Sequence, residues 1–213
     1  MANLNEQLKK MKKYIRLLEK YTSTDDLKTF LHKKNIEFNS VNYLGKGEYG
    51  TAYSLRNGKV FKLTNSPNEF EIAGQLLHKK MPGIVQYYDR GWYSDKPTIY
   101  YIVMDEVDTE MDEVDTDSSI EDMFYRVELI LTTQNLDISQ INYFDEDEYD
   151  GSEGDLDSDT LKFMNELHTI YRSCQQLGIR VPDINYGNLG YDASGILTAF
   201  DLQDRAAMRG RTW

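Results

Sequence analysis

The chain has 213 residues, of which 40% are apolar and 12% aromatic, and its net charge is −12. This size allows one hydrophobic core or a two-lobed unit, but not two large independent domains. The single cysteine, Cys174, and three histidines exclude a disulfide framework and a cysteine–histidine zinc site, so a bound metal is expected to have oxygen ligands. The longest apolar run, residues 100–104, is too short to span a membrane, which predicts a cytoplasmic protein without membrane contact.

The charge is concentrated in one segment. Residues 105–159 contain 21 of the 36 acids and a single base, Arg126, so this segment carries about −20 and the remainder about +8. Such a segment repels phosphates, and we do not expect it to bind nucleic acid. A basic protein partner, or the protein's own basic surface, would be attracted to it.

Two helices are predicted at the N-terminus. Apolar residues at helical spacing over residues 4–20, with basic residues between them, indicate an amphipathic helix with a basic face. A second helix is predicted over residues 25–34, with Thr24 as its N-cap. The favoured interpretation is a packed helical extension with a solvated face, and contact with a membrane surface is the weaker alternative.

Short strands then alternate with one helix. Asn57-Gly58 lies between two of the strands and predicts a hairpin with a type I′ turn. Ser66 as N-cap, Pro67 at the first helical position and Glu69 in a capping box predict a helix that ends before Pro82-Gly83. The predicted strands cover residues 41–44, 52–56, 60–63, 84–88 and 98–104.

The acidic segment contains a short tandem duplication. The hexapeptide MDEVDT occurs at residues 104–109 and again at 111–116, and two copies are too few for a solenoid, so a local insertion is expected. Helices are predicted over residues 118–132 and 160–177, the second ended by Gly178, and residues 145–159 have the composition of a solvated acidic linker. Short strands are predicted over residues 179–181, 189–191 and 196–200.

A glycine pattern, G-x-G-x-x-G, is formed by Gly45, Gly47 and Gly50. It joins two strands of a predicted hairpin, so its backbone N–H groups are expected to cover phosphates from above. Lys62 follows on the next strand, where it shares a face with Val60. A lysine beneath such a loop needs a carboxylate to hold it. Of the two glutamates on the following helix, Glu69 is assigned to the capping box, and Glu71 is therefore the expected partner.

Three polar side chains near the C-terminus complete the set. Asp183 and Asn188 are five positions apart, and Asp201 follows on a hydrophobic strand. An acid near an acceptor hydroxyl, with an amide oxygen and a carboxylate on Mg²⁺, is the combination that phosphoryl transfer needs.

The chain resembles the protein-kinase-like superfamily, which includes protein kinases and aminoglycoside and choline phosphotransferases. The resemblance lies in the order of the motifs: glycine loop, lysine, glutamate, aspartate, asparagine and a second aspartate. The resemblance covers roughly residues 41–205 and implies ATP and Mg²⁺ as cofactors. It implies that Asp183 is the catalytic base, that Asn188 and Asp201 bind the metal, and that Lys62 and Glu71 form the ion pair that orients the phosphates.

The resemblance also implies an adenine pocket. Met104 resembles the gatekeeper, the backbone of residues 105–107, including Asp105 and Val107, would face adenine, and Leu44, Ala52 and Val60 would enclose the base. The implied fold is α+β and two-lobed, with an N-terminal helical extension (1–40), an antiparallel N-lobe sheet (41–104) and a hinge with a minimal helical C-lobe (105–213) that contains the acidic insertion 105–159.

Departures from the family pattern affect regulation and substrate. The usual His-Arg before the catalytic aspartate is Val181-Pro182 here, which argues against control by activation-loop phosphorylation. The Asp-Phe-Gly triplet is Asp201-Leu202-Gln203, which keeps the metal ligand and loses the glycine. Only residues 204–213 follow, so neither an activation segment nor a peptide platform is expected.

The leading functional prediction is an ATP- and Mg²⁺-dependent phosphotransferase, more similar to Ser/Thr protein kinases than to small-molecule kinases. The alternative is a pseudokinase-like binding module whose acidic segment engages a basic partner. Modification of the chain itself is a third possibility, and short kinase-like proteins of bacteriophages are a further similarity. The candidate acceptors for self-modification are Thr109, Thr116, Ser118, Ser119, Ser152 and Ser158.

Overall fold

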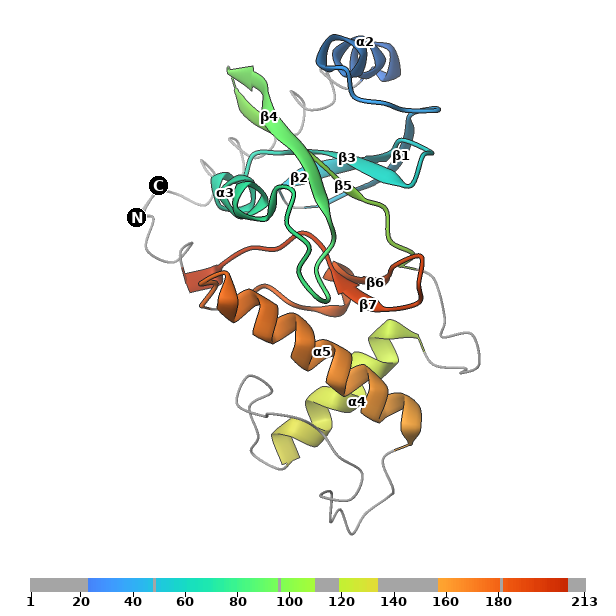
Figure 1. Ribbon diagram of the computed structural model, residues 1–213, viewed down its shortest axis with the longest axis vertical. Coiled ribbons are helices and arrows are strands. Elements are labelled where there is room, and N and C mark those ends of the chain that lie inside the picture. The colour runs from blue at the N-terminus through green and yellow to red at the C-terminus, as the bar shows by residue number, and fades with distance from the viewer. Residues whose placement is uncertain are drawn as a thin grey trace, which may run out of the picture. The chain divides into compact units, whose positions relative to one another are not determined.

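The computed structural model describes residues 23–47, 49–95, 97–109, 119–133, 157–180 and 182–206. These residues form an antiparallel five-stranded sheet, a two-stranded sheet and four α-helices, which confirms the predicted α+β class (Figure 1). The predicted helix 4–20, the second copy of the duplication and most of the acidic segment lie outside the described residues. The chain divides into two compact units, Met1–Pro67 with Asp89–Met104, and Asn68–Tyr88 with Asp105–Trp213.

The five-stranded sheet belongs mainly to the first unit, and its strand order is β1-β2-β3-β5-β4. The first three strands form consecutive antiparallel hairpins, with a register shift in β1 between Tyr43 and Gly45. The strands are β1 (Asn42–Lys46), β2 (Gly50–Ser54), β3 (Lys59–Thr64), β4 (Tyr87–Asp95) and β5 (Thr98–Asp105).

Helix α2 (Thr24–Lys34) packs on one face of this sheet. Its residues Leu27 and Leu31 are fully buried and share a core with Phe61 and Leu63 of β3. The N-cap is Ser23 and not Thr24 as predicted, because the Ser23 hydroxyl accepts the backbone N–H of residue 26 at 3.1 Å. The helix therefore begins one residue earlier than the sequence indicated.

The alternation of side chains along β3 defines a second face of the sheet. Because Phe61 and Leu63 point into the core with α2, Val60 and Lys62 point to the opposite face. The predicted shared face of Val60 and Lys62 is thus present in the first unit. Lys62 is paired in register with Ala52 of β2.

The hairpin between β2 and β3 is present, but its turn is not of the predicted type. A type I′ turn needs positive φ at both central residues. Here the positive φ values fall on Arg56 (54°) and Gly58 (76°), while the Asn57 side chain donates to the backbone oxygen of Glu37 at 2.8 Å. The contact with the segment before β1 selects a different loop conformation.

The second unit is built around a small sheet and two helices. Strands β6 (Leu189–Tyr191) and β7 (Leu197–Ala199) form a hairpin, and residues 83–85 extend it, because the Val85 N–H donates to the Ala199 oxygen at 3.1 Å and the Ala199 N–H to the Gly83 oxygen at 2.8 Å. The predicted strand 84–88 is therefore split between this pairing and the start of β4. Instead of the predicted strand 179–181, the described residues show a helix ending, in which the Ile179 N–H donates to the Cys174 oxygen at 3.0 Å.

Helix α3 (Pro67–Leu76) begins at the proline and ends before Pro82-Gly83, both as predicted. The chain turns at His78, whose φ is 61°, and Leu77 forms a parallel bridge with Tyr87. This pairing competes with another helical turn and stops the helix.

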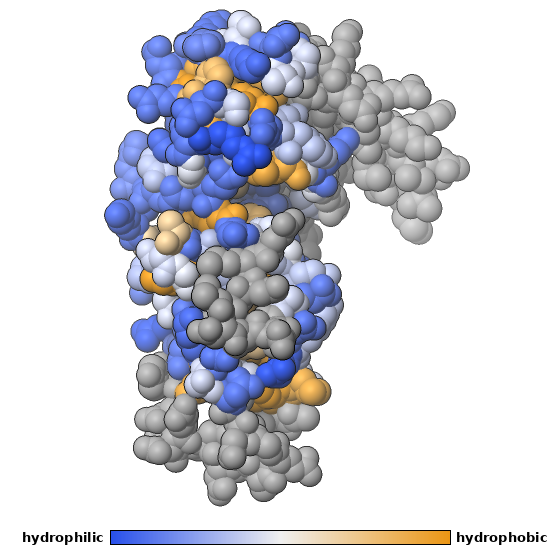
Figure 2. All heavy atoms as spheres, turned by 90° about the vertical axis from the view of Figure 1, so that its right-hand side faces the viewer, coloured by the Kyte–Doolittle hydropathy of each residue, from blue (hydrophilic) through white to orange (hydrophobic). Residues whose placement is uncertain are grey.

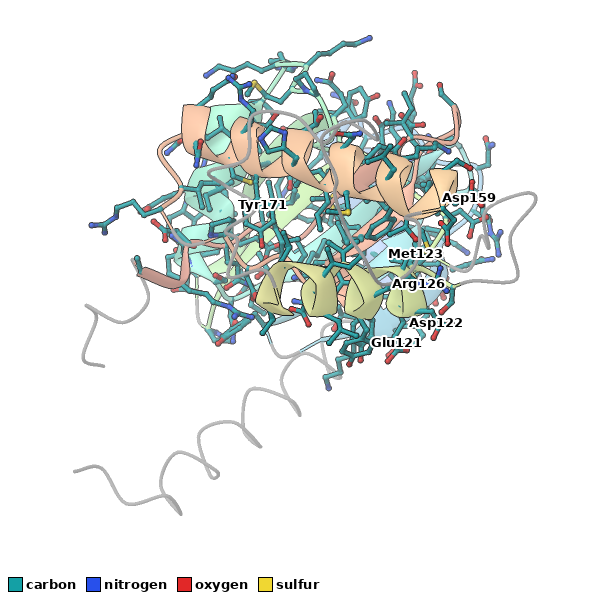
Figure 3. All side chains as sticks on the ribbon, turned by 90° about the horizontal axis from the view of Figure 1, so that it is seen from below. Glu121, Asp122, Met123, Arg126, Asp159 and Tyr171 are labelled. Carbon is teal, nitrogen blue, oxygen red and sulfur yellow. The ribbon has the colours of Figure 1, made fainter. Side chains whose placement is uncertain are left out.

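Helices α4 (Ile120–Thr133) and α5 (Ser158–Gln176) lie side by side (Figures 1 and 3). Arg126 of α4 donates to the carboxylate of Asp157, the N-cap of α5, at 2.8 Å, and Asp157 also accepts the Thr160 N–H at 2.7 Å. Helix α5 is followed by Gly178 at φ 74°, the predicted helix-ending glycine.

Candidate functional site

The loop 183–188 is held in one conformation by its own side chains. The Asn185 carboxamide oxygen accepts the Gly187 N–H at 3.0 Å, and the short 3-10 turn Tyr186–Asn188 follows. The Asn188 Nδ2 donates to the backbone oxygen of Asp183 at 2.8 Å. Because this bond fixes one side of the amide, Asn188 Oδ1 lies on the other side, away from that oxygen.

Backbone hydrogen bonds bring Asp201 to this loop. The Phe200 N–H donates to the Asn188 oxygen, and the Asp183 N–H donates to the Gln203 oxygen, both at 3.0 Å. Asp201 lies between these two bonds and has a φ of 54°, in the left-handed region that aspartate tolerates better than most residues. Backbone hydrogen bonds thus connect the loop that carries Asp183 and Asn188 with the segment that carries Asp201.

Tyr87, at the start of β4, has a hydroxyl group that is affected both by Asp201 and by Glu69 of α3. Burial raises the pKa of its hydroxyl well above the ordinary value of 10.0, and the charges of Glu69, Asp201 and Cys174 raise it further. A hydrogen bond with the backbone of Leu202 acts on the pKa in the opposite direction. The charges of Glu69 and Asp201 thus act on the same buried hydroxyl.

The two glutamates of α3 have different environments. Glu69 is 2% exposed, whereas Glu71 is an exposed residue. A buried carboxylate requires polar or charged partners, while an exposed one is solvated. The predicted pairing of Glu71 with Lys62 remains a prediction. The buried glutamate, Glu69, is the one that the sequence assigned to the capping box.

Arg205 was not predicted as a site residue. Its guanidinium forms an ion pair with Oδ1 of Asp183, and Asn185 Nδ2 lies 3.4 Å from the same oxygen. The sequence offered one signal, namely that Arg205 is a base four positions after Asp201. The fold is needed to bring residues 182 and 204 together as an antiparallel bridge.

The glycine loop lies in the first unit, and its three glycines differ. A Cβ at Gly50 would lie 2.2 Å from the backbone oxygen of Leu63, so the fold itself requires glycine there. At Gly45 and Gly47 a Cβ would meet nothing within 4 Å. The Gly47 N–H donates to the Gly50 oxygen at 2.9 Å and closes the turn.

The predicted phosphate and adenine residues of the first unit differ in their exposure. Lys62 is 7% exposed, and Val60 and Met104 are also buried. Ala52 is half-buried, whereas Leu44 is 49% exposed on β1. Burying a lysine ammonium costs free energy unless anions compensate its charge. Buried lysines therefore often have a functional role.

The predicted hinge residues Asp105 and Val107 belong to the second unit. The Asp105 N–H donates to the Gln86 oxygen at 3.0 Å. A ligand contact by the backbone of Asp105 therefore has to use its carbonyl oxygen. The Asp105 carboxylate accepts the Tyr88 hydroxyl at 2.7 Å, and this bond, ahead of burial, raises the pKa of Tyr88 to about 12. Residue 108 then pairs with Tyr191 of β6.

A cavity of about 380 Å³ in the second unit is lined by residues 80–86 and 196–198 together with Asp105, Val107, Glu166, Thr169 and Asp192. Asp183, Asn188 and Asp201 do not line it. This cavity is therefore separate from the residues predicted to carry the chemistry.

The donor set fits a hard cation. An amide oxygen and a carboxylate are ligands that Mg²⁺ accepts, with substrate phosphates and water completing its shell. Within the described ranges there is no cluster of three or more histidine, cysteine, aspartate or glutamate side chains that could hold a metal by itself. Asn188 and Asp201 would thus hold Mg²⁺ together with the phosphates of a nucleotide.

The exposed hydrophobic side chains are dispersed. On the face shown in Figure 2, hydrophobic residues form small areas among hydrophilic ones. The exposed rings of Tyr125 of α4 and Tyr186 lie against each other, with centroids 5.8 Å apart. Of the helices that the structure describes, none has the length and apolarity needed to cross a membrane.

Comparison of the chain with models of protein families and with curated proteins finds no match.

Proposed function

We propose that the protein is an ATP- and Mg²⁺-dependent phosphotransferase with a two-lobed, kinase-like fold. The observation that carries the proposal is the hydrogen-bonded frame in which Asn188 holds the Asp183 carbonyl and residues 200 and 203 bond to residues 188 and 183. This frame joins an acid, an amide and a second acid, which are the groups that phosphoryl transfer uses.

In this proposal Asp183 orients the acceptor hydroxyl and receives its proton, while Asn188 Oδ1 and the Asp201 carboxylate hold Mg²⁺. Mg²⁺, when bound there, would neutralise charge on the phosphates of the nucleotide. Lys62 and the N–H groups of the glycine loop bind the phosphates. The open space at Gly45 and Gly47 supports this role, because the fold itself does not require glycine there.

The adenine is proposed to lie against Leu44, Ala52 and Val60, with Met104 as gatekeeper. The backbone of Asp105 to Val107 is the proposed hydrogen-bonding edge, and the bond from Asp105 to Gln86 leaves the Asp105 carbonyl for this purpose. The exposed side chain of Leu44 has apolar surface that a bound base would cover.

We propose that Glu69, and not Glu71, is the glutamate of α3 that takes part in the site. The burial of Glu69 and the effect of its charge on the buried Tyr87 hydroxyl support this choice, because a buried carboxylate is stable only with polar or charged neighbours. The exposed Glu71 has water as an alternative partner.

The phosphoryl acceptor is proposed to be a protein hydroxyl, which rests on the resemblance to protein kinases. The binding-module alternative assigns the protein to capture of a basic partner by residues 105–159. The two functions differ in turnover, so one experiment separates them.

The test is transfer of the γ-phosphate of ATP, with Mg²⁺, to a mixed protein substrate, comparing the native chain with Asp183→Asn and Asp201→Asn. We expect each variant to lose activity by about 100-fold or more. Asp95→Asn is the matched control, because Asp95 is exposed at the end of β4 and lies outside the proposed site. Nucleotide binding without turnover in the native chain, or no binding at all, would favour the binding module.

A further inference from the structure

The ion pair between Arg205 and Asp183 places a cation at the proposed catalytic carboxylate. The Asp183 side chain is 22% exposed and that of Arg205 is 53% exposed. Arg205 contacts Oδ1 of Asp183, which is also near Asn185 Nδ2. The other carboxylate oxygen, Oδ2, accepts no hydrogen bond from the part of the chain that the structure describes.

The backbone on both sides of Arg205 is anchored. The Asp204 N–H donates to the side-chain oxygen of Asn68 on α3 at 2.7 Å, and the Ala206 N–H donates to the Asp204 carboxylate at 2.9 Å. Residues 182 and 204 form an antiparallel bridge. The position of Arg205 beside Asp183 is therefore set by the same backbone frame that carries Asp183.

The guanidinium has more donors than this ion pair uses. Arginine carries five N–H groups in a fixed planar arrangement, and phosphate oxygens match that arrangement. With its side chain about half exposed, Arg205 can keep its contact with Oδ1 and donate to a second anion. Oδ2 then remains for an acceptor hydroxyl.

We propose that Arg205 contacts the phosphoryl group during its transfer and holds Asp183 with Oδ2 toward the acceptor. This inference rests on the proposed function. The acceptor oxygen forms a bond to the γ-phosphorus while the bond from the γ-phosphorus to the bridging oxygen breaks, and its electron pair leaves with ADP. The acceptor proton passes to Oδ2 of Asp183. Negative charge on the γ-phosphoryl oxygens is stabilised by Arg205 as this happens.

The experiment compares the native chain with Arg205→Ala and Arg205→Lys, with Arg172→Ala as control because Arg172 is exposed on α5. It measures kcat, the KM for ATP, the affinity for ADP and the melting temperature. We expect Arg205→Ala to lower kcat about 100-fold, the size of a lost transition-state donor, without changing ADP affinity. Ethylguanidinium in the assay should restore part of the lost kcat, which a purely structural role would not allow. Arg205→Lys should fall between the two, because lysine retains the charge and loses the planar donors.

The inference is overturned if Arg205→Ala retains the native kcat, or if its kcat rises, since a rise would mean that Arg205 blocks the base. If Arg205→Ala does not fold, Arg205→Lys decides: a lower kcat at an unchanged melting temperature supports the inference, and a native kcat overturns it. A native chain without any transfer removes the proposed function and this inference with it, whereas an active native chain with a fully active Arg205→Ala removes this inference alone.

Discussion

The Nδ2 atom of Asn188 donates a hydrogen bond of 2.8 Å to the backbone oxygen of Asp183. The two residues are five positions apart, and the bond closes the loop between them. It also fixes which atom of the Asn188 amide is left for a metal ion. A single contact thus sets both the shape of the loop and the orientation of a proposed ligand.

The first prediction concerns Asn188→Ala. We expect the Mg²⁺ concentration for half-maximal turnover to rise by about 10-fold or more, because an oxygen ligand is lost. The loss of the bond to Asp183 should also lower the free energy of unfolding by about 1 kcal/mol. Asn185→Ala is the matched control, because it loses a comparable bond, to the Gly187 N–H, but no proposed ligand. An unchanged Mg²⁺ requirement in Asn188→Ala would remove Asn188 from the metal site.

A second prediction separates the two glutamates of α3. Glu69→Gln should abolish most of the ATP turnover, because it removes a buried charge that acts on the Tyr87 hydroxyl. Glu71→Gln, at an exposed position of the same helix, should be as active as the native chain. Steady-state kinetics on both variants decides the matter, and the reverse result would restore the role that the sequence assigned to Glu71.

The glycine loop gives a third prediction, for stability. Gly50→Ala should lower the free energy of unfolding by about 1–3 kcal/mol, because its Cβ would lie 2.2 Å from the Leu63 backbone oxygen and the strands must shift. Gly47→Ala has no such contact within 4 Å and should unfold at nearly the native urea concentration. Equal unfolding curves for the two variants would contradict the close approach of β2 and β3 at Gly50.

A fourth prediction concerns pH and the N-cap of α5. The Thr160 N–H, and then the charge of Arg126, lower the pKa of Asp157 below its ordinary value of 3.8, although partial burial opposes this. A lowered folded pKa contributes stability above the unfolded pKa, and this contribution is lost as the pH falls through the folded value. Asp157→Ala should therefore cost about 1 kcal/mol at neutral pH, and less as the pH falls below 3.8.

Urea unfolding of native and Asp157→Ala proteins on both sides of this pH measures the difference. Asp157→Asn is the control, because asparagine retains the capping oxygen without the charge. A difference between native and Asp157→Ala proteins that grows toward acidic pH would contradict the sign of the pKa shift.

The single cysteine provides a fifth prediction. Cys174 on α5 is fully buried, and burial raises the pKa of its thiol to about 12. Because the thiolate is the reactive form, a disulfide reagent should not modify the folded protein at mildly alkaline pH, and should modify one thiol per chain in denaturant. Cys174→Ser gives the background. Rapid reaction of the folded protein would mean that α5 is readily exposed.

Sequence reasoning predicted the elements that local patterns specify. Helix α5 was predicted over residues 160–177 and spans 158–176, because its apolar spacing and Gly178 are local signals. Helix α3 ends before Pro82-Gly83, as predicted, but the pairing of Leu77 with Tyr87 that stops it was not predicted, because it depends on a later segment.

The site was predicted only as far as each residue's neighbours in the sequence allowed. Asp183, Asn188 and Asp201 are marked by spacing, and the structure connects their backbones. Glu69 and Glu71 lie about 200° apart around the axis of α3, and tertiary packing decides which of them faces the interior. The burial of Glu69 was therefore missed. Arg205 was missed because its neighbour pairs with residue 182, a contact across 22 positions.

The pairing of residues 83–85 with β7 has a consequence for synthesis of the chain on the ribosome. Residue 199 follows residue 85 by 114 positions, which at ordinary translation speeds is a delay of roughly 6–23 s. During that time the backbone groups of Gly83 and Val85 have no strand to bond, because their partner does not yet exist. The second unit therefore closes late, when its last strand reaches a segment made near the beginning of the unit, and a chaperone that covers residues 83–85 in the meantime would favour correct folding.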